Sequence, residues 1–266
     1  TDESAAAIKY YIKWADQYKK ACKLIYGKDA KLNDFKKAEQ LLLSESQRGN
    51  VLAVYDLGKL YSTDKLGERN EEMSVAKYTR ALQGFLRIEP NSKKLKPYVQ
   101  YRIGKMFCYG LGTEQDYEKA FEWFERSAKQ KNKFAQFSLA NLYYYGSGVK
   151  KDLSQAFLWY QRSSSQGQPY AAYSIAQMYR YGEYVTKDND TAQRYYQQAL
   201  SAFLKIESDD MANDDLFYKL GQMFKLGLGT DSDVTKAIEY FRCSAEYSLF
   251  NELTCYIILV RIKCVK

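Results

Sequence analysis

Leu139-Ala-Asn-Leu-Tyr-Tyr-Tyr-Gly-Ser-Gly-Val-Lys-Lys-Asp152, followed by Gln155-Ala-Phe-Leu-Trp-Tyr160, is the stretch of sequence that decides the fold. Leu139, Leu142 and Tyr143 have the i, i+3, i+4 spacing of one apolar helix face. The two glycines in Gly-Ser-Gly can adopt the positive φ that ends a helix. Asp152 lies where a carboxylate caps the start of a second helix. The stretch therefore predicts a helix hairpin.

The hairpin pattern recurs along the chain at fixed offsets from a small residue that follows Leu or Ile. An aromatic residue comes three positions after it, and in the last four copies a glycine comes at six, an aspartate at twelve and an alanine at sixteen. One hairpin is too thin to bury both of its faces, so copies of this kind stack into a solenoid. The small residues are Gly58, Gly104, Ala140, Ala176 and Gly221.

Two of the copies are longer than the others. The period is 36 residues from Gly104 to Ala140 and again to Ala176, whereas it is 46 before Gly104 and 45 after Ala176. The segment Ala81 to Glu89 resembles the segment Ala199 to Glu207, which lies 118 positions later. We therefore expect the second helix to be extended by about two turns in both long copies.

The repeats resemble Sel-one-like (Sel1-like) repeats, a branch of the tetratricopeptide superfamily. The resemblance covers residues 97–247 well and 52–89 in a degenerate form, with a weaker copy from Ala21. It implies an all-α fold: a right-handed alpha-alpha superhelix, a single solenoid of about six helix-turn-helix repeats. The expected boundaries are 5–48, 50–89, 97–131, 133–167, 169–207 and 214–247, with a terminal capping helix at 249–266.

Composition argues against catalysis. The sequence has no histidine, which removes the usual general base near neutral pH and the commonest metal ligand. Its five cysteines lack C-x-x-C spacing and their number is odd, which indicates neither a zinc site nor a disulfide framework. Each G-x-G loop follows a predicted helix, so a turn is favoured over a phosphate site. We expect no enzyme activity, no cofactor and no metal.

The resemblance implies that the first helices line a concave groove, so their residues outside the core stripe are candidates for partner binding. Positions spaced by four and seven residues share one helix face and combine aromatic with amide or cationic groups. Packing within the core is the alternative for the aromatic positions. The candidates are Tyr101, Lys105, Phe137, Asn141, Tyr144, Tyr173, Gln177, Arg180, Tyr218, Gln222 and Lys225.

The leading functional hypothesis is a non-catalytic scaffold that binds a peptide or protein segment in the groove. The net charge of +8 permits weak attraction to acidic peptides and to nucleic acid and identifies neither. A protein or peptide ligand with acidic groups is the expected partner, and nucleic acid is the less favoured one. The array of long and short repeats also resembles those appended to mobilisation relaxases of Gram-positive bacteria, which gives a C-terminal accessory module of a DNA-processing protein as the alternative. We expect a bacterial, cytoplasmic protein without membrane contact, cut from a longer chain because no methionine precedes Thr1.

Overall fold

The computed structural model describes residues 9–26, 30–208 and 214–248. Within these ranges the chain forms α-helices, two short 3-10 helices and a single isolated bridge between Tyr11 and Asn50. The predicted all-α class is therefore confirmed, whereas the predicted capping helix at 249–266 lies outside the described residues. The α-helices are α1 (Asp16–Tyr26), α2 (Leu32–Gln47), α3 (Val51–Tyr61), α4 (Glu71–Ile88), α5 (Lys96–Tyr109), α6 (Tyr117–Lys129), α7 (Lys133–Tyr145), α8 (Leu153–Ser164), α9 (Pro169–Tyr181), α10 (Asn189–Ser208), α11 (Asp214–Leu226) and α12 (Val234–Ser248).

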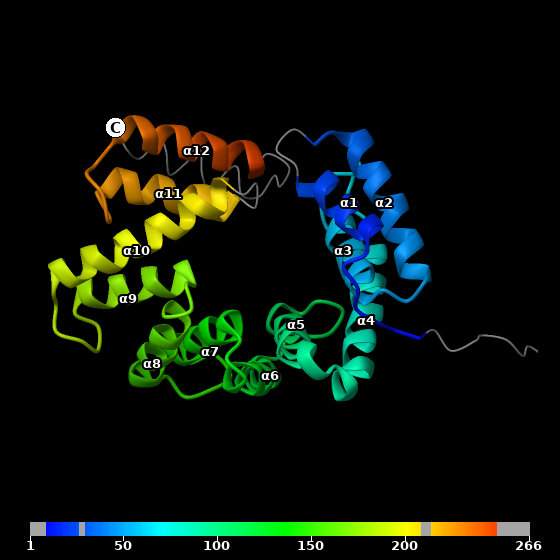
Figure 1. Cartoon of the computed structure of the whole chain (residues 1–266), viewed down its shortest axis with the longest axis horizontal. Helices are drawn as coiled ribbons and strands as arrows, with labels where there is room; N and C mark the ends of the chain where they lie inside the picture. The colour runs from blue at the N-terminus through cyan, green and yellow to red at the C-terminus, as the bar shows by residue number, and fades with distance from the viewer. Residues whose placement is uncertain (1–8, 27–29, 209–213, 249–266) are drawn as a thin grey trace, which may run out of the picture. The chain divides into compact units, whose positions relative to one another are not determined.

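The chain divides into two compact units, unit 1 from Thr1 to Gln130 and unit 2 from Lys131 to Lys266. Each unit contains three helix hairpins, in which an odd-numbered first helix packs against the even-numbered second helix that follows it (Figure 1). Within a unit, second helices also contact the first helix of the next hairpin. Each unit therefore has its own stacked core, and a single solenoid over the whole chain stays a prediction.

The predicted turn chemistry is confirmed in the hairpin of α7 and α8. Gly146 has φ 74° and its N–H donates to the carbonyl oxygen of Leu142 at 2.8 Å, which closes the last turn of α7. Asp152 precedes α8 and its carboxylate accepts hydrogen bonds from the backbone N–H groups of Ser154 and Gln155 at 2.9 and 3.0 Å. The same cap occurs at all four predicted aspartates, Asp116, Asp152, Asp188 and Asp233.

The small residues of the repeat lie where the two helices of a hairpin come closest. Ala140 and Ala176 are fully buried. A Cβ atom added at Gly104 would come within 2.6 Å of the Phe124 ring, and one added at Gly221 within 2.7 Å of the Phe241 ring. In these two hairpins the second helix therefore places an aromatic ring directly over the glycine.

The two predicted long second helices are confirmed as α4 and α10, with 18 and 20 residues against 13 and 12 in α6 and α8. Their additional turns bury one phenylalanine each, Phe85 in unit 1 and Phe203 in unit 2, both with 0% exposure. The extensions are therefore part of the hydrophobic core of each unit.

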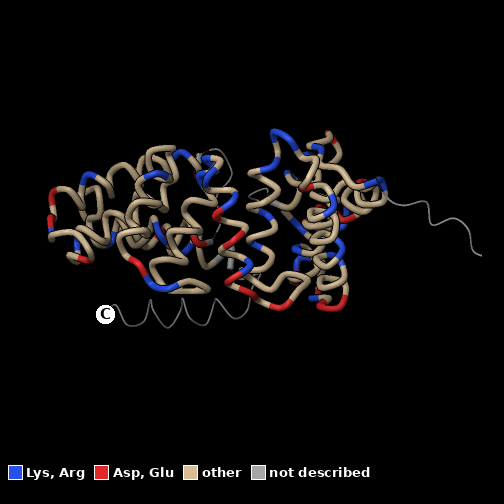
Figure 2. Tube along the Cα trace, turned by 90° about the horizontal axis from the view of Figure 1, so that it is seen from below, with Lys and Arg blue, Asp and Glu red and all other residues tan. Residues whose placement is uncertain are grey.

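Charged residues of both signs are interspersed along each unit (Figure 2). Most ion pairs within the described residues join side chains three or four positions apart on one helix, with at least one partner well exposed to solvent, and pairs of this kind contribute little to stability. No helix in the described part of the chain is both long and apolar enough to cross a membrane.

The aspartate caps predict a specific response to acid. The pKa values of Asp116, Asp152 and Asp188 lie below the ordinary value because nearby side chains and the backbone N–H groups at the helix start donate hydrogen bonds to the carboxylates. Stability from this source is present above the unfolded pKa of about 3.9 and is lost as pH falls through the lower folded pKa.

Changing all three to asparagine, which caps equally well without titrating, should reduce the loss of stability on acidification. Urea unfolding, monitored by circular dichroism at pH 7 and at pH 3, measures this loss of stability in the wild type and in the triple variant. If the unfolding midpoints of the wild type and the triple variant fall equally, other carboxyl groups dominate the acid response.

Candidate partner-binding site

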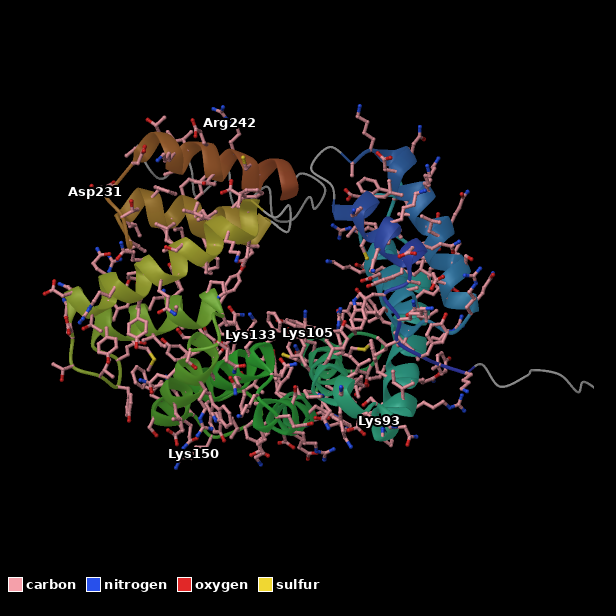
Figure 3. The ribbon with its side chains drawn as sticks, viewed as in Figure 1. Lys93, Lys105, Lys133, Lys150, Asp231 and Arg242 are labelled. Atoms are coloured by element: carbon pink, nitrogen blue, oxygen red, sulfur yellow. The ribbon has the colours of Figure 1, made fainter. Side chains whose placement is uncertain are left out.

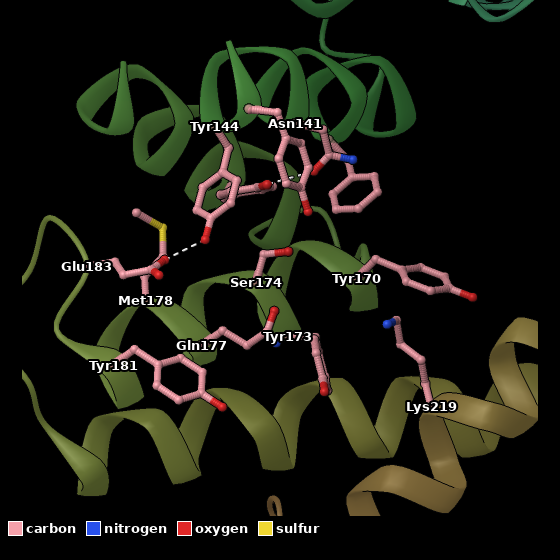
Figure 4. A pocket seen from close by; sticks show the side chains of 13 residues that line it. Asn141, Tyr144, Tyr170, Tyr173, Ser174, Gln177, Met178, Tyr181, Glu183 and Lys219 are labelled. Carbon is pink, nitrogen blue, oxygen red and sulfur yellow. Dashed lines mark hydrogen bonds between the residues drawn. The ribbon is translucent and has the colours of Figure 1, made fainter. Parts of the chain in front are cut away.

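Unit 2 contains a pocket of about 340 Å³ that is lined by α7, α8, α9 and α11 and by the turn after α9 (Figure 4). Six of its residues are tyrosines, and the remaining polar groups are mostly amide and hydroxyl side chains. The lining residues are Phe137, Asn141, Tyr144, Tyr145, Tyr160, Tyr170, Tyr173, Ser174, Gln177, Met178, Tyr181, Glu183 and Lys219.

The helical period explains why these side chains meet. Phe137, Asn141 and Tyr144 are spaced by four and three residues, so they share one face of α7. Tyr170, Tyr173 and Gln177 occupy the corresponding face of α9, one repeat later. Since α8 joins α7 to α9 and packs on both, the two faces come together on one side of unit 2.

Two tyrosine hydroxyls have fixed roles in the pocket wall. Tyr160, which is almost fully buried, donates to Oδ1 of Asn141 at 2.6 Å, and Tyr144 donates to Oε2 of Glu183 at 2.5 Å. Burial raises the pKa of Tyr160, and the hydrogen bond to Glu183 raises the pKa of Tyr144 to about 12, so both phenols stay protonated. Because Oδ1 of Asn141 is used as an acceptor, its Nδ2 group is left as the donor.

The rim of the pocket is aromatic and open to solvent. Tyr145 and Tyr181 are 71% and 63% exposed, although each has a large apolar ring. Lys219 lies with Nζ 4.9 Å from the centre of the Tyr173 ring. Lys219 adds one positive charge to the lining of the pocket, and Glu183 adds one negative charge. Exposed tyrosines around a concave site, with few charged groups, are typical of protein-binding surfaces.

Five of the predicted site residues line this pocket: Phe137, Asn141, Tyr144, Tyr173 and Gln177. The others lie elsewhere. The guanidinium of Arg180 lies 5.7 Å from the centre of the Tyr181 ring and does not line the pocket. Tyr218, Gln222 and Lys225 lie on α11, whose contribution to the pocket is Lys219 instead. Tyr101 and Lys105 belong to α5 in unit 1.

The predicted aromatic positions also pack within their own repeats. The ring centres are 5.9 Å apart for Tyr101 and Phe124 and for Phe137 and Tyr160, 5.2 Å for Tyr173 and Tyr196, and 5.6 Å for Tyr218 and Phe241. Phe137 and Tyr173 therefore take part in core packing and in the pocket wall together.

Sequence reasoning missed the exposed tyrosines of the rim. Tyr145 and Tyr181 occupy the last position of a first helix, directly before the glycine that ends it, as does Tyr109 in unit 1, and all three are at least 63% exposed. Their regular position was visible in the repeat alignment. Their exposure was not, because an aromatic residue in that register fits a buried stripe equally well.

Comparison with known proteins identifies the repeat. The family model for the Sel1 repeat matches residues 2–19, 97–132, 133–168, 169–202 and 218–246, together more than half of the chain. No curated protein matches the sequence significantly.

Several solved structures share the fold. A Sel1 repeat protein from Oxalobacter formigenes is 23% identical with a TM-score of 0.52, over 79% of this chain and 78% of that chain. Two immunity proteins from Pseudomonas aeruginosa are both 19% identical, with TM-scores of 0.53 and 0.52, over 87% and 88% of this chain and 80% of theirs. At these identities the likeness establishes the all-α superhelical repeat fold and nothing more specific.

Proposed function

We propose that this chain, which belongs to the Sel1 repeat family, is a non-catalytic scaffold that binds a peptide or protein segment in the tyrosine-lined pocket of unit 2. Sel1 repeat proteins are generally protein-interaction scaffolds. The single observation that carries the proposal is the pocket itself, in which exposed aromatic rings surround a small number of polar groups.

The chemistry of the pocket supports one anchoring side chain of the partner. A volume of about 340 Å³ is at the lower end of the range for ligand sites, which fits one large side chain and not a folded element. The aromatic walls would bury an apolar or aromatic group. Nδ2 of Asn141 and the amide of Gln177 would then bond to the peptide backbone on either side of the anchor.

The test is peptide selection with the full-length chain. Dodecapeptides selected from a random display library would be labelled, and their Kd measured by fluorescence anisotropy for the wild type and for a variant with Tyr145→Ser, Gln177→Ala and Tyr181→Ser. These positions avoid the buried hydrogen bonds of Tyr160 and Tyr144. We expect Kd to rise at least about tenfold, because truncating a hot-spot residue costs about 2 kcal/mol or more.

Leu226→Ser is the matched control. Leu226 is 52% exposed and occupies the same register before its glycine, but it does not line the pocket. The Leu226→Ser variant should bind the selected peptides with the same Kd as the wild type. Selected peptides that bind the pocket variant as tightly as the wild type would show that another surface is used. Duplex DNA bound with a steep salt dependence, and equally by both proteins, would favour the accessory role in a DNA-processing protein.

A further inference from the structure

Unit 1 carries a different kind of surface between its first helices α3 and α5. The guanidinium of Arg102 lies 4.7 Å from the ring centre of Tyr55 and 5.2 Å from that of Tyr98. Its Nε donates to the Tyr98 hydroxyl at 2.9 Å, and Tyr55 also hydrogen-bonds to it. Arg102 is therefore held in one orientation by aromatic rings and neutral oxygens.

A second cation lies next to Arg102 on the same helix. Lys105, three positions further along α5, has Nζ 6.0 Å from the ring centre of Tyr101 and 5.7 Å from that of Tyr109. Both cations are half-buried. Figure 3 shows Lys105 on the side of α5 that faces away from α6. This is the side of the hairpin on which the first helix lies.

Cations outnumber carboxylates around Arg102 and Lys105 in the described part of unit 1. Neither Arg102 nor Lys105 forms an ion pair within the described residues. The nearby carboxylate is Asp56 on α3, which is buried and accepts a hydrogen bond from the Tyr18 hydroxyl at 2.6 Å. Burial raises the pKa of Asp56, which weakens it further as a counter-ion.

We propose that Arg102 and Lys105 form a carboxylate-binding site on unit 1, which receives an acidic side chain of a protein partner. The proposal rests on the proposed role as a protein-binding scaffold but does not depend on the pocket of unit 2. Arg102 and Lys105, with Lys59 nearby, outnumber the adjacent carboxylate Asp56, so the site carries an excess of positive charge that an acidic side chain offsets. A carboxylate is also planar and can accept two hydrogen bonds from the outer N–H groups of a guanidinium. The rings of Tyr55 and Tyr98 already fix the plane of the Arg102 guanidinium.

The protonation of Lys105 gives the site a measurable signature. Burial, with Arg102 and Lys59 adding repulsion, lowers the pKa of Lys105 to about 8, against a weak opposing effect of Cys108. Tyr101 and Tyr109 are the rings that face it. A bound carboxylate stabilises the ammonium form, so it raises this pKa and is bound less tightly as pH rises through about 8. The same change makes Lys105 less reactive toward acylating reagents.

The probe is a fluorescent hexaglutamate peptide, with hexaglutamine as the uncharged reference, titrated against the full-length chain at low salt. Lys105→Gln should raise the Kd for hexaglutamate about tenfold, because a charge-assisted hydrogen bond is lost. Lys150→Gln, which removes an exposed lysine from a turn in unit 2, should leave it unchanged. Acylation at pH 8 followed by mass spectrometry should show Lys105 protected by hexaglutamate, while the exposed Lys36 is not.

The variants separate this site from the pocket of unit 2. The pocket variant described above should bind hexaglutamate like the wild type, so failure of one proposal leaves the other testable. Three results would overturn the carboxylate site. The first is no saturable binding of hexaglutamate, and the second is an equal loss of hexaglutamate affinity in Lys105→Gln and Lys150→Gln. The third is a twelve-nucleotide oligothymidylate that binds more tightly than hexaglutamate and protects Lys105 more strongly. Arg102→Gln provides a second variant, and circular dichroism confirms that each variant is folded.

Discussion

Phe203→Ala is expected to lower the free energy of unfolding by about 3 to 5 kcal/mol. Phe203 lies in the extended part of α10 with 0% exposure, inside the core of unit 2. Its ring centre lies 4.9 Å from that of Tyr170 in an edge-to-face arrangement. Truncation removes the transfer free energy of the ring and leaves a cavity that the surrounding helices fill only in part.

Phe203→Leu is the control, because it keeps most of the volume and should cost less than about 1.5 kcal/mol. Urea unfolding monitored by circular dichroism measures both variants. Since Tyr170 lines the pocket, the alanine variant should also bind selected peptides more weakly than the leucine variant, measured without urea where both variants are folded. Equal stability of the wild type and the alanine variant would show that the additional turns of α10 are not part of the core.

Gly229→Ala is expected to destabilise far more than Gly167→Ala, although both glycines have nearly the same backbone conformation. Their φ angles are 73° and 75°. A Cβ atom at Gly229 would come within 2.4 Å of the backbone nitrogen of Gln197 on α10, whereas nothing lies within 4 Å of one at Gly167. Both variants incur the left-handed strain of about 1 to 2 kcal/mol, and only Gly229→Ala forces α10 and the turn apart.

The difference between the two variants isolates the close approach of the backbones, which we expect to add about 1 to 3 kcal/mol. Thermal and urea unfolding of both variants under the same conditions give this difference directly. Equal destabilisation would mean that the turn after α11 can move away from α10 without loss. The pair therefore tests whether the second glycine of G-x-G is needed for stacking or only for the turn.

The two proposed sites use different chemistry on the same repeated scaffold. The pocket of unit 2 pairs aromatic walls with amides and balanced charges, whereas the site of unit 1 concentrates positive charge among tyrosines. At the position where unit 2 has Asn141 and Gln177, unit 1 has Lys105. Under the two proposals, substitution at one register of the repeat changes the ligand class without changing the fold.

Local sequence determined the helices, their ends and the repeat. Aspartate before a second helix and glycine after a first helix act on backbone groups only a few residues away, so their effects follow from spacing alone. Tyr184 is an exception to this local rule. It has φ 68° at the position of the second turn glycine, although it is not glycine, and its ring lies 5.6 Å from that of Phe157. A contact with another element thus accompanies this left-handed conformation, which the glycine pattern did not predict.

The sequence by itself determined the all-α repeat, the register of its helix faces and five of the residues that line the pocket. Only the tertiary structure decided that Glu183 and Lys219 complete that pocket, that Tyr145 and Tyr181 are exposed, and that Arg102 lies between two rings. The physical reason is that helix periodicity places a side chain on a face, whereas exposure and partners depend on how closely successive hairpins pack. That spacing is set by buried contacts between residues far apart in the sequence.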